Sequence, residues 1–596
     1  MSTAQKVRRG LDGAAAIALR DEAPPPLAAG FADVDMGDSA SAAALARLNE
    51  AIAGLRAMRV APLLQDAVAA IRAGDSARAS EIAIEALNLD DRNGHAWHLL
   101  AISREHCDDF RSSIAAYEAA LALLPDHADV ANDLGRLAFR LGMTEVAAQL
   151  FALYREARPT CPQGANNLAC ALRDLHEYQA AIDILKLAIE AEPTSAMLWN
   201  TLATVVIARG DTANAVPFLT EAVRLEHGFA RARYTRANAR VEFGDIDGAI
   251  EDLDHAIATS EFESDRAMMR FARAHTLLLG GRVAEGWDAY EARFAPQFAS
   301  RLNFLIDRPR WAPEAALTGK SMLLIGEQGL GDEVMFANIL PDVIDALGPA
   351  GRLSVAVEPR LVPLFRRSFP GVAFTTYADL TLDGHSYRIA QGVDEAEFDL
   401  WAPLAAPLRR FRPSVESFPN RGGYLTPDPA RIEHWRATLS GLPGRKVGIL
   451  WKSLKLDGAR LREFSPFEGW RPVLEAPGVT FVNLQYGECD VELAHAREAF
   501  GVDIWRPPGI DLKDDLDDLA ALCCALDLVL GPANATTNIA GACGAVTWFI
   551  STPMAWPRLG ADRYPWYPSV RAFIAHAYGQ WDVVMGEIAL ALGQGN

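Results

Sequence analysis

Disulfide bonds and cysteine-based metal sites are the first features that this sequence lacks. Its 596 residues include seven cysteines, and no two of them form a CxxC pair. An odd set of cysteines without such pairs argues against a disulfide framework and against a structural zinc site. Free cysteines are typical of a reducing compartment, so we expect a cytoplasmic protein.

Long apolar runs and an excess of basic residues are also missing. No uninterrupted run of about 18 apolar residues occurs, so we predict no membrane span, and the first 30 residues lack the apolar segment of a signal peptide. Acidic residues outnumber basic ones by 77 to 57, which gives a net charge of −20. This balance argues against general nucleic-acid binding, which needs a basic surface.

The first half of the chain contains an internal repeat of 34 residues. Three series of mostly small residues recur in register: Ala67, Ala101, Gly135, Ala169, Ala203 and Ala237; Ala79, Ser113, Ala147, Ala181, Ala215 and Ala249; Ala86, Ala120, Tyr154, Ala188, Ala222 and Ala256. Gly-Asp turns and prolines separate the expected helices. The pattern resembles the tetratricopeptide repeat, whose stacked helix pairs form a solenoid with a concave groove. We expect a flexible tail over 1–55, with a possible helix at 41–58, and a repeat array over 56–293.

Strands and helices alternate in the second half of the chain. Apolar strands are predicted at 321–325, 352–357, 446–450, 479–484, 526–530 and 545–550, with a C-terminal helix at 580–592. Alternation of this kind predicts parallel sheets with right-handed crossovers. We therefore expect two Rossmann-like halves, 294–415 and 446–596, joined by a linker at 416–445. Their ligand would lie in a cleft between the carboxyl ends of the strands.

A glycine-rich turn follows the strand predicted at 321–325. It reads Gly326-Glu327-Gln328-Gly329-Leu330-Gly331-Asp332 and precedes a helix predicted at 333–347. Glycines in such a turn let backbone N–H groups approach a ligand, and the following helix N-terminus favours negative charge. A tight strand-to-helix turn in which Asp332 caps the helix explains the same residues.

Two stretches of the second half offer groups for an anion. Lys452, Lys455 and Arg462 follow the strand predicted at 446–450 and suit a phosphate; a solvated basic loop is the alternative. Hydroxyl and amide side chains gather at a second predicted helix start: Asn534, Thr536, Thr537 and Asn538. These side chains could bind an anion at the helix N-terminus, and simple helix capping is the alternative. The aspartates at 514, 515, 517 and 518 fit a helix first turn better than a metal site.

Polar residues recur at the fifth position of the repeats. They are His98, Asn132, Asn166, Asn200 and Tyr234, with Asn167 at a sixth position. Asparagines 34 residues apart would form a ladder along the groove and could bind an extended peptide backbone. The arrangement is similar to the acceptor-binding ladder of the animal O-GlcNAc transferase; ordinary polar lining is the alternative.

The second half resembles the sugar-transferase part of bacterial tetratricopeptide glycosyltransferases, which have the GT-B fold. The turn at 326–332 carries this resemblance, and it is also similar to the Gly-Asp turn of the lipopolysaccharide heptosyltransferases. The resemblance implies that Asp332, or else Glu327, is the base that deprotonates a serine or threonine hydroxyl. The residues that it places around the donor are Gln328, Gly329, Gly331, Lys452, Lys455, Arg462, Gln485, Asn534, Thr536, Thr537 and Asn538.

One loop departs from the family pattern Asp-Thr-x-x-x-His-x-Ala-Gly-Ala. Ala533 and Asn534 stand for Asp-Thr, and Asn538 stands for the histidine. The departure removes a histidine that could serve in catalysis or phosphate binding. The identity of the sugar donor is therefore not determined by this loop.

This loop, the chain length and the alanine-rich N-terminus are most similar to the flagellin glycosyltransferases of flagellated bacteria. That resemblance implies CMP-activated pseudaminic acid as donor, serine or threonine of flagellin as acceptor, a role in flagellum assembly and motility, and no cofactor or metal. Two alternatives remain. One is transfer of GlcNAc from UDP-GlcNAc to another protein, and the other is a repeat scaffold or chaperone with a degenerate transferase domain.

Overall fold

A computed structural model describes residues 39–382, 384–453 and 460–594. The chain divides into two compact units, Met1–Glu226 and His227–Asn596. The boundary lies inside the predicted repeat array, so the last repeats belong to the same unit as the sheets. Most of the predicted tail at 1–55 and the donor-site candidate Lys455 lie outside the described residues.

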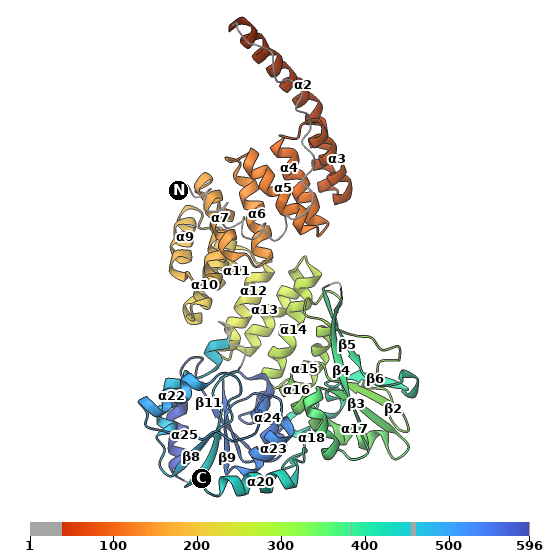
Figure 1. Cartoon of the computed structure of the whole chain (residues 1–596), viewed down its shortest axis with the longest axis vertical. Helices are drawn as coiled ribbons and strands as arrows, with labels where there is room; N and C mark the ends of the chain where they lie inside the picture. Colours follow the sequence, from red (N-terminus) through yellow and green to blue (C-terminus); the bar gives the residue numbers. More distant parts are fainter. Residues whose placement is uncertain (1–38, 383, 454–459, 595–596) are drawn as a thin grey trace. The chain divides into compact units, whose positions relative to one another are not determined.

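Helices packed in pairs build the first unit (Figure 1). They are α2 (Ser39–Arg72), α3 (Ser76–Leu89), α4 (Gly94–His106), α5 (Phe110–Leu123), α6 (Ala128–Arg140), α7 (Thr144–Ala157), α8 (Pro162–Asp174), α9 (Tyr178–Ala191), α10 (Ala196–Ala208) and α11 (Thr212–Leu225). The possible helix at 41–58 is part of α2, which continues into the first repeat.

Apart from the half-buried Ala188, the residues of the three repeated series are buried inside the helix pairs, which confirms the predicted repeat. Ala101 and Ala203 have no exposed surface, and a Cβ added to Gly135 would come within 2.7 Å of the Phe151 ring. The Gly-Asp turns also have the predicted form. Gly74 has a φ of 78°, which suits glycine, and the Asp75 carboxylate caps α3 by accepting a hydrogen bond from the backbone N–H of Arg78 at 3.0 Å.

The second unit begins with the remaining helices of the array. These are α12 (Ala230–Glu242), α13 (Ile246–Thr259), α14 (Glu263–Leu279), α15 (Val283–Ala289) and the 3-10 helix η1 (Tyr290–Phe294). They agree with a last, irregular repeat and lead directly into the first sheet.

The α12–α13 pair has a charged interior. The Asp252 carboxylate is 1% exposed and accepts hydrogen bonds from Arg236 at 2.6 and 2.7 Å and from Arg233 at 3.1 Å. Arg240 forms an ion pair with it at 3.1 Å. The residues 34 positions before these three arginines are apolar: Trp199, Leu202 and Val206. An ion network has therefore replaced apolar packing in this repeat.

The first sheet has the order β1-β5-β4-β3-β2-β6. Its strands are β1 (Leu302–Phe304), β2 (Ser321–Ile325), β3 (Arg352–Val357), β4 (Ala373–Leu382), β5 (His385–Ala390) and β6 (Leu400–Pro403). Strands β4, β3, β2 and β6 are parallel, but β5 is antiparallel to β4. The predicted parallel sheet is confirmed for these four strands, and a hairpin adds an antiparallel pairing toward one edge.

The second sheet is entirely parallel, in the order β11-β10-β9-β7-β8. Its strands are β7 (Arg445–Ile449), β8 (Val479–Asn483), β9 (Leu528–Pro532), β10 (Thr547–Ser551) and β11 (Val570–Ile574). The helices around it are η6 (Arg460–Glu463), η7 (Phe467–Trp470), α21 (Arg471–Leu474), α22 (Asp490–Ala499), α23 (Leu516–Ala525), α24 (Ala535–Ala542), η8 (Trp556–Arg558) and α25 (Asp582–Gly593).

Each sheet has a point where the strand order reverses. Strand β2 lies between β3 and β6, and β7 lies between β8 and β9. In parallel α/β sheets, ligands bind in the crevice at the carboxyl ends of the strands at such a switch point. The glycine-rich turn follows β2, and the two candidate anion-binding stretches follow β7 and β9.

The helix predicted at 333–347 begins earlier and is interrupted. The helices of the first half are α16 (Leu330–Phe336), η2 (Ala337–Ile339), α17 (Leu340–Leu347), η3 (Pro359–Leu361), α18 (Val362–Ser368), η4 (Glu395–Glu397), α19 (Leu408–Phe411) and η5 (Val415–Ser417). Gly329 is the N-cap of α16. Asp332 therefore lies in the first helical turn and is not the cap.

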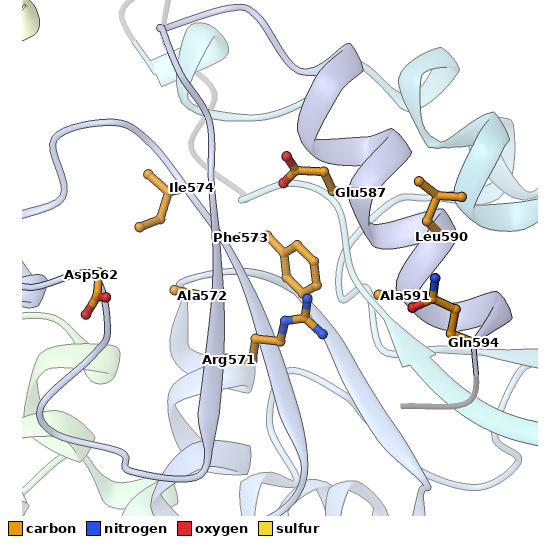
Figure 2. A pocket seen from close by; sticks show the side chains of 9 residues that line it. All are labelled: Asp562, Arg571, Ala572, Phe573, Ile574, Glu587, Leu590, Ala591 and Gln594. Carbon is orange, nitrogen blue, oxygen red and sulfur yellow. The ribbon is translucent and has the colours of Figure 1, made fainter.

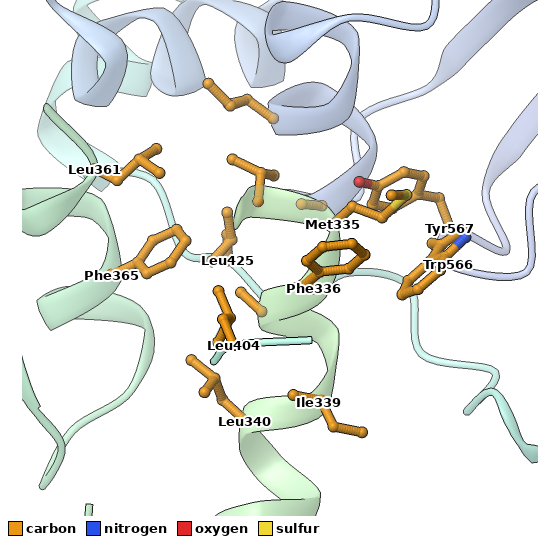
Figure 3. Packing of buried hydrophobic residues seen from close by; sticks show 14 of the residues in the cluster. Met335, Phe336, Ile339, Leu340, Leu361, Phe365, Leu404, Leu425, Trp566 and Tyr567 are labelled. Atoms are coloured by element: carbon orange, nitrogen blue, oxygen red, sulfur yellow. The ribbon is translucent and has the colours of Figure 1, made fainter. Parts of the chain in front are cut away.

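The predicted linker at 416–445 is part of the folded core. It contains α20 (Pro429–Leu439), which packs against α23, and Trp435 of this helix has no exposed surface. The proline, glycine and arginine content of the segment had suggested a loose connection. Figure 3 shows the continuous apolar packing nearby, where Met335 and Phe336 of α16 lie beside Trp566 and Tyr567.

Candidate functional site

The glycine-rich turn at the first switch point is held through Glu327. Its carboxylate is 1% exposed, and both oxygens accept hydrogen bonds, from Arg293 Nε at 2.7 Å and from the backbone N–H of Ala405 at 2.8 Å. Ala405 follows β6, so Glu327 bridges the two strands of the switch point. Because its oxygens are engaged, Glu327 is less suited than Asp332 to accept a substrate proton.

Asp332 is half-buried in the first turn of α16. Burial raises the pKa of its carboxyl to about 6, and the negative charge of Glu327 acts in the same direction, whereas a hydrogen bond from the Gly329 backbone opposes the shift. A carboxylate with a pKa this close to neutrality is a stronger base than an ordinary aspartate.

Side chains from the last helices of the array form the wall behind this turn. Gln328 donates a hydrogen bond from Nε2 to the Tyr290 hydroxyl at 3.0 Å, so its amide is engaged within the chain. His275 packs edge-on against Tyr290, and burial lowers the pKa of His275 to about 4. Sequence reasoning missed Tyr290, Arg293 and His275, because contacts between a repeat helix and a distant turn have no local signal.

The predicted cationic loop after β7 is largely engaged in contacts within the chain. Lys452 pairs with Glu492 of α22, and Arg462 pairs with Glu242 of α12 while lying 5.0 Å from the centre of the Tyr578 ring. Gln485 is 2% exposed, and its Oε1 accepts backbone hydrogen bonds from Trp451 and Lys452. The Gln485 amide therefore joins the ends of β7 and β8 and is not free to read a nucleotide base.

The loop between β9 and α24 is a capping box. Asn534 is the N-cap of α24, its Oδ1 accepts from the Thr537 backbone N–H at 3.3 Å, and the Thr537 hydroxyl accepts from the Asn534 backbone N–H at 3.0 Å. Thr536 and Thr537 are buried. The Asn534 amide nitrogen is also buried, and it has no hydrogen-bond partner within the described part of the chain. Capping thus accounts for Thr537, while this buried amide is left without a hydrogen-bond partner among the described residues.

The starts of helices α16 and α24, the two candidate anion-binding helix starts, contact each other. Asn538 of α24 donates from Nδ2 to the Gly331 carbonyl at 3.4 Å, and a Cβ on Gly331 would come within 3.0 Å of the same nitrogen. Helices α16 and α24 pack closely here. The structure therefore brings Gly331, the neighbour of Asp332 in the chain, against Asn538 and against the backbone of Ala535, the neighbour of Asn534. That these residues form one binding site stays a prediction.

The acidic run at the start of α23 pairs with arginines. The partners are Arg360 for Asp514, Arg367 for Asp517 and Arg431 for Asp518. Arg360 and Arg367 come from the first half of the sheet region, so the run joins that half to the second.

A pocket of about 580 Å³ opens between β11 and α25 (Figure 2). Its wall includes Arg571 and Phe573 of the strand and Glu587 and Leu590 of the helix. None of the predicted site residues line it.

Part of the predicted ladder, from His98 to Thr201, is present in the first unit as a chain of side-chain hydrogen bonds. Each link joins the fifth position of one repeat to the sixth position of the next. The links are His98 to Asp133 at 2.9 Å, Asn167 to Asn132 at 2.9 Å and Thr201 to Asn166 at 2.6 Å. Asp133 and Thr201 were missed, although the spacing of 35 residues could have identified them.

Neighbouring residues within a repeat complete the ladder. Asn132 donates to Asp133, and Asn166 donates to Asn167. These bonds fix the amides, and each amide nitrogen still has a second hydrogen to donate. Asn200 has a buried Oδ1 without a partner among the residues described. Tyr234 is half-buried and lies on α12, in the second unit.

Comparisons with known proteins agree with the repeat architecture. Residues 108–162, 166–226 and 234–298 match the family model of the tetratricopeptide repeat. Protein FlbA of Caulobacter vibrioides is 52% identical to this chain over 559 residues, which cover 94% of each protein. The chain therefore belongs to the family of FlbA.

Solved structures resemble only part of the chain. PilW, a widely conserved type IV pilus biogenesis factor, is 19% identical, and the match covers 35% of this chain and 97% of PilW with a TM-score of 0.32. MamA from Desulfovibrio magneticus RS-1 is 15% identical, with 28% of this chain and 96% of MamA covered and a TM-score of 0.27. Within the described residues, no helix has the length and apolar character needed to cross a bilayer.

Proposed function

We propose that this chain is a cytoplasmic protein O-glycosyltransferase. It transfers pseudaminic acid, a nonulosonic acid, from its CMP-activated form to serine or threonine of flagellin, and flagellum assembly and motility depend on the transfer. The observation that carries the proposal is the contact between α16 and α24, in which Asn538 donates to the carbonyl of Gly331, the residue before Asp332, whose carboxyl has a raised pKa. The name of its relative FlbA is of the flagellar type and is consistent with this acceptor.

The chemistry follows from these groups. Ionised Asp332 accepts the proton of the acceptor hydroxyl while the oxygen attacks the anomeric carbon of the sugar. The bond from that carbon to the CMP phosphate breaks, and CMP leaves with the electron pair. The N-terminus of α24 and the Asn534 amide stabilise the phosphate charge, since helix N-termini favour anions. No metal or cofactor takes part in this scheme.

Intact masses of flagellin test the transfer directly. Flagellin is co-expressed with this chain and with a pathway that makes CMP-pseudaminic acid, and its mass is compared with that of flagellin expressed without this chain. We expect adducts in multiples of one nonulosonic-acid residue. A HexNAc-sized adduct would instead support transfer from UDP-GlcNAc.

The amide ladder is expected to bind the acceptor. Replacing Asn132 and Asn166 together by alanine removes two amides, each worth about 0.5–1.5 kcal/mol as a hydrogen-bond donor. The Kd for unfolded flagellin should therefore rise about tenfold or more, while turnover at saturating flagellin is retained. Fluorescence anisotropy measures the Kd, and Asn214→Ala, at an exposed position on α11, is the matched control. Wild-type affinity in the double variant would assign acceptor binding elsewhere.

One observation favours a non-catalytic repeat scaffold as a second candidate. Lys452, Arg462 and Gln485, which were predicted to hold the donor, are all engaged in contacts within the chain. Flagellin that binds the repeats with normal affinity but keeps its unmodified mass would support this candidate.

A further inference from the structure

The 3-10 helix η1 holds the glycine-rich turn through one arginine. Arg293 is 5% exposed, and its guanidinium lies 4.0 Å from the centre of the Tyr290 ring and 4.1 Å from that of Phe294. Its Nη1 donates to the Tyr290 carbonyl at 2.6 Å, and its Nε donates to Glu327 at 2.7 Å. The two aromatic rings and the two hydrogen bonds thus fix the Arg293 guanidinium, which in turn fixes the Glu327 carboxylate.

Glu327 is itself part of the glycine-rich turn, so its bond to Arg293 restricts the position of the turn. Its other oxygen accepts from the Ala405 backbone after β6, so one buried carboxylate connects η1, the turn and the neighbouring strand end. The bond from Gln328 to the Tyr290 hydroxyl is a second tie between η1 and the turn. Asp332 is five residues beyond Glu327, at the end of the segment that these contacts hold.

The charges around Asp332 come from several elements. Glu327 of the turn acts on it directly and raises its pKa. Tyr290 of η1 and Tyr567, which follows η8, also interact with it electrostatically. Arg293 faces Glu327, Tyr290 and also Glu291 of η1, with which it forms an ion pair at 3.5 Å. His275 of α14 lies behind them without charge near neutral pH. Among these side chains, Glu327 is the one whose negative charge raises the pKa of Asp332, and its hydrogen bonds fix its position.

We propose that Glu327 and Arg293 are positioning residues for Asp332, so that the final helical element of the repeat array orients the base of the transferase site. This inference rests on the proposed function. It assigns Glu327 a role that differs from the alternative base suggested by the sequence.

The test compares the pH dependence of transfer in three variants with the wild type. Removal of the Glu327 charge in Glu327→Gln moves the acidic limb of the pH–rate profile to lower pH. The double variant Arg293→Gln, Glu327→Gln moves it in the same direction and leaves no unpaired charge buried. Arg293→Lys keeps the cation, so the limb stays at the wild-type pH. In each variant kcat falls about 10- to 100-fold because the base is misplaced, and the KM for the donor changes little.

Two further readouts make the outcome decisive. Asp288→Asn, on the neighbouring α15, removes an exposed carboxylate that pairs with Arg409 of α19, and it should leave the profile unchanged. Hydrogen exchange of the peptide 326–336 should be faster in all three variants, whether or not transfer is detected. The inference is overturned if the acidic limb of the pH–rate profile stays at the wild-type pH in Glu327→Gln and in the double variant. It is also overturned if the exchange rate of this peptide does not change. Absence of transfer by the wild type overturns only the proposed function.

Discussion

Asp332→Asn should abolish most of the transfer of sugar to flagellin. Asparagine has nearly the same shape, but it cannot accept the hydroxyl proton, and general-base catalysis typically contributes about 100- to 10,000-fold. We therefore expect kcat to fall by this range while donor binding is retained. Turnover is measured from flagellin masses over time. If this variant keeps the wild-type kcat, the catalytic base must be a residue other than Asp332.

The stability of Asp332→Asn separates lost chemistry from lost folding. The pKa of Asp332 is raised in the folded protein, so its ionised form destabilises the fold once the pH exceeds the pKa of the unfolded chain. The amide removes this cost, and Tm at pH 8 should be equal to or higher than that of the wild type. Asp345→Asn, at an exposed position on α17, is the matched control and should keep full activity. The same pKa predicts that wild-type turnover rises as the pH passes about 6.

Asp252→Asn should destabilise the α12–α13 repeat by about 3–5 kcal/mol, because removing one partner of a buried ion network leaves the other charges without compensation. Three arginines share this carboxylate, and Asp245 pairs with only one of them, Arg240, at 3.4 Å. We expect amide hydrogen exchange in peptides from 230–259 to become about 100-fold faster or more.

A neighbouring aspartate on the same helix gives the control for this effect. Asp254 is 52% exposed and pairs with Arg273. Exposed pairs contribute about 0–1 kcal/mol, so Asp254→Asn should leave exchange near the wild-type rate. Equal exchange in the two variants would mean that the network around Asp252 contributes no more than a surface ion pair.

Much of the architecture could be predicted because it depends on local patterns. The 34-residue period identified the helix pairs, and β2 and β3 were predicted to the residue from their apolar runs. The hairpin of β4 and β5, the edge strand β11 and helix α20 were missed. Their residues are partly exposed or mixed in character, and their pairing depends on distant strands that no local pattern reveals.

The candidate site could be assembled from the sequence only in part. Asp332, Gly331 and Asn538 were singled out from two separate turns, and the structure brings these turns together. Gln485 was assigned to the donor, yet its amide caps strand ends, since sequence does not show which partner a buried amide takes. Arg293 was missed for the related reason that its partner Glu327 lies 34 residues further along the chain.

If the ladder in the first unit binds the acceptor as proposed, its structure has a consequence for how that acceptor is chosen. Its amides are held by one another before any ligand arrives, so little side-chain freedom is lost when a peptide binds. Their remaining hydrogens suit backbone carbonyls, which every sequence has. A segment is then selected by being extended and unpaired, and a folded or polymerised subunit hides those carbonyls. Modification would accordingly belong to the interval between synthesis of the acceptor and its incorporation into a larger structure.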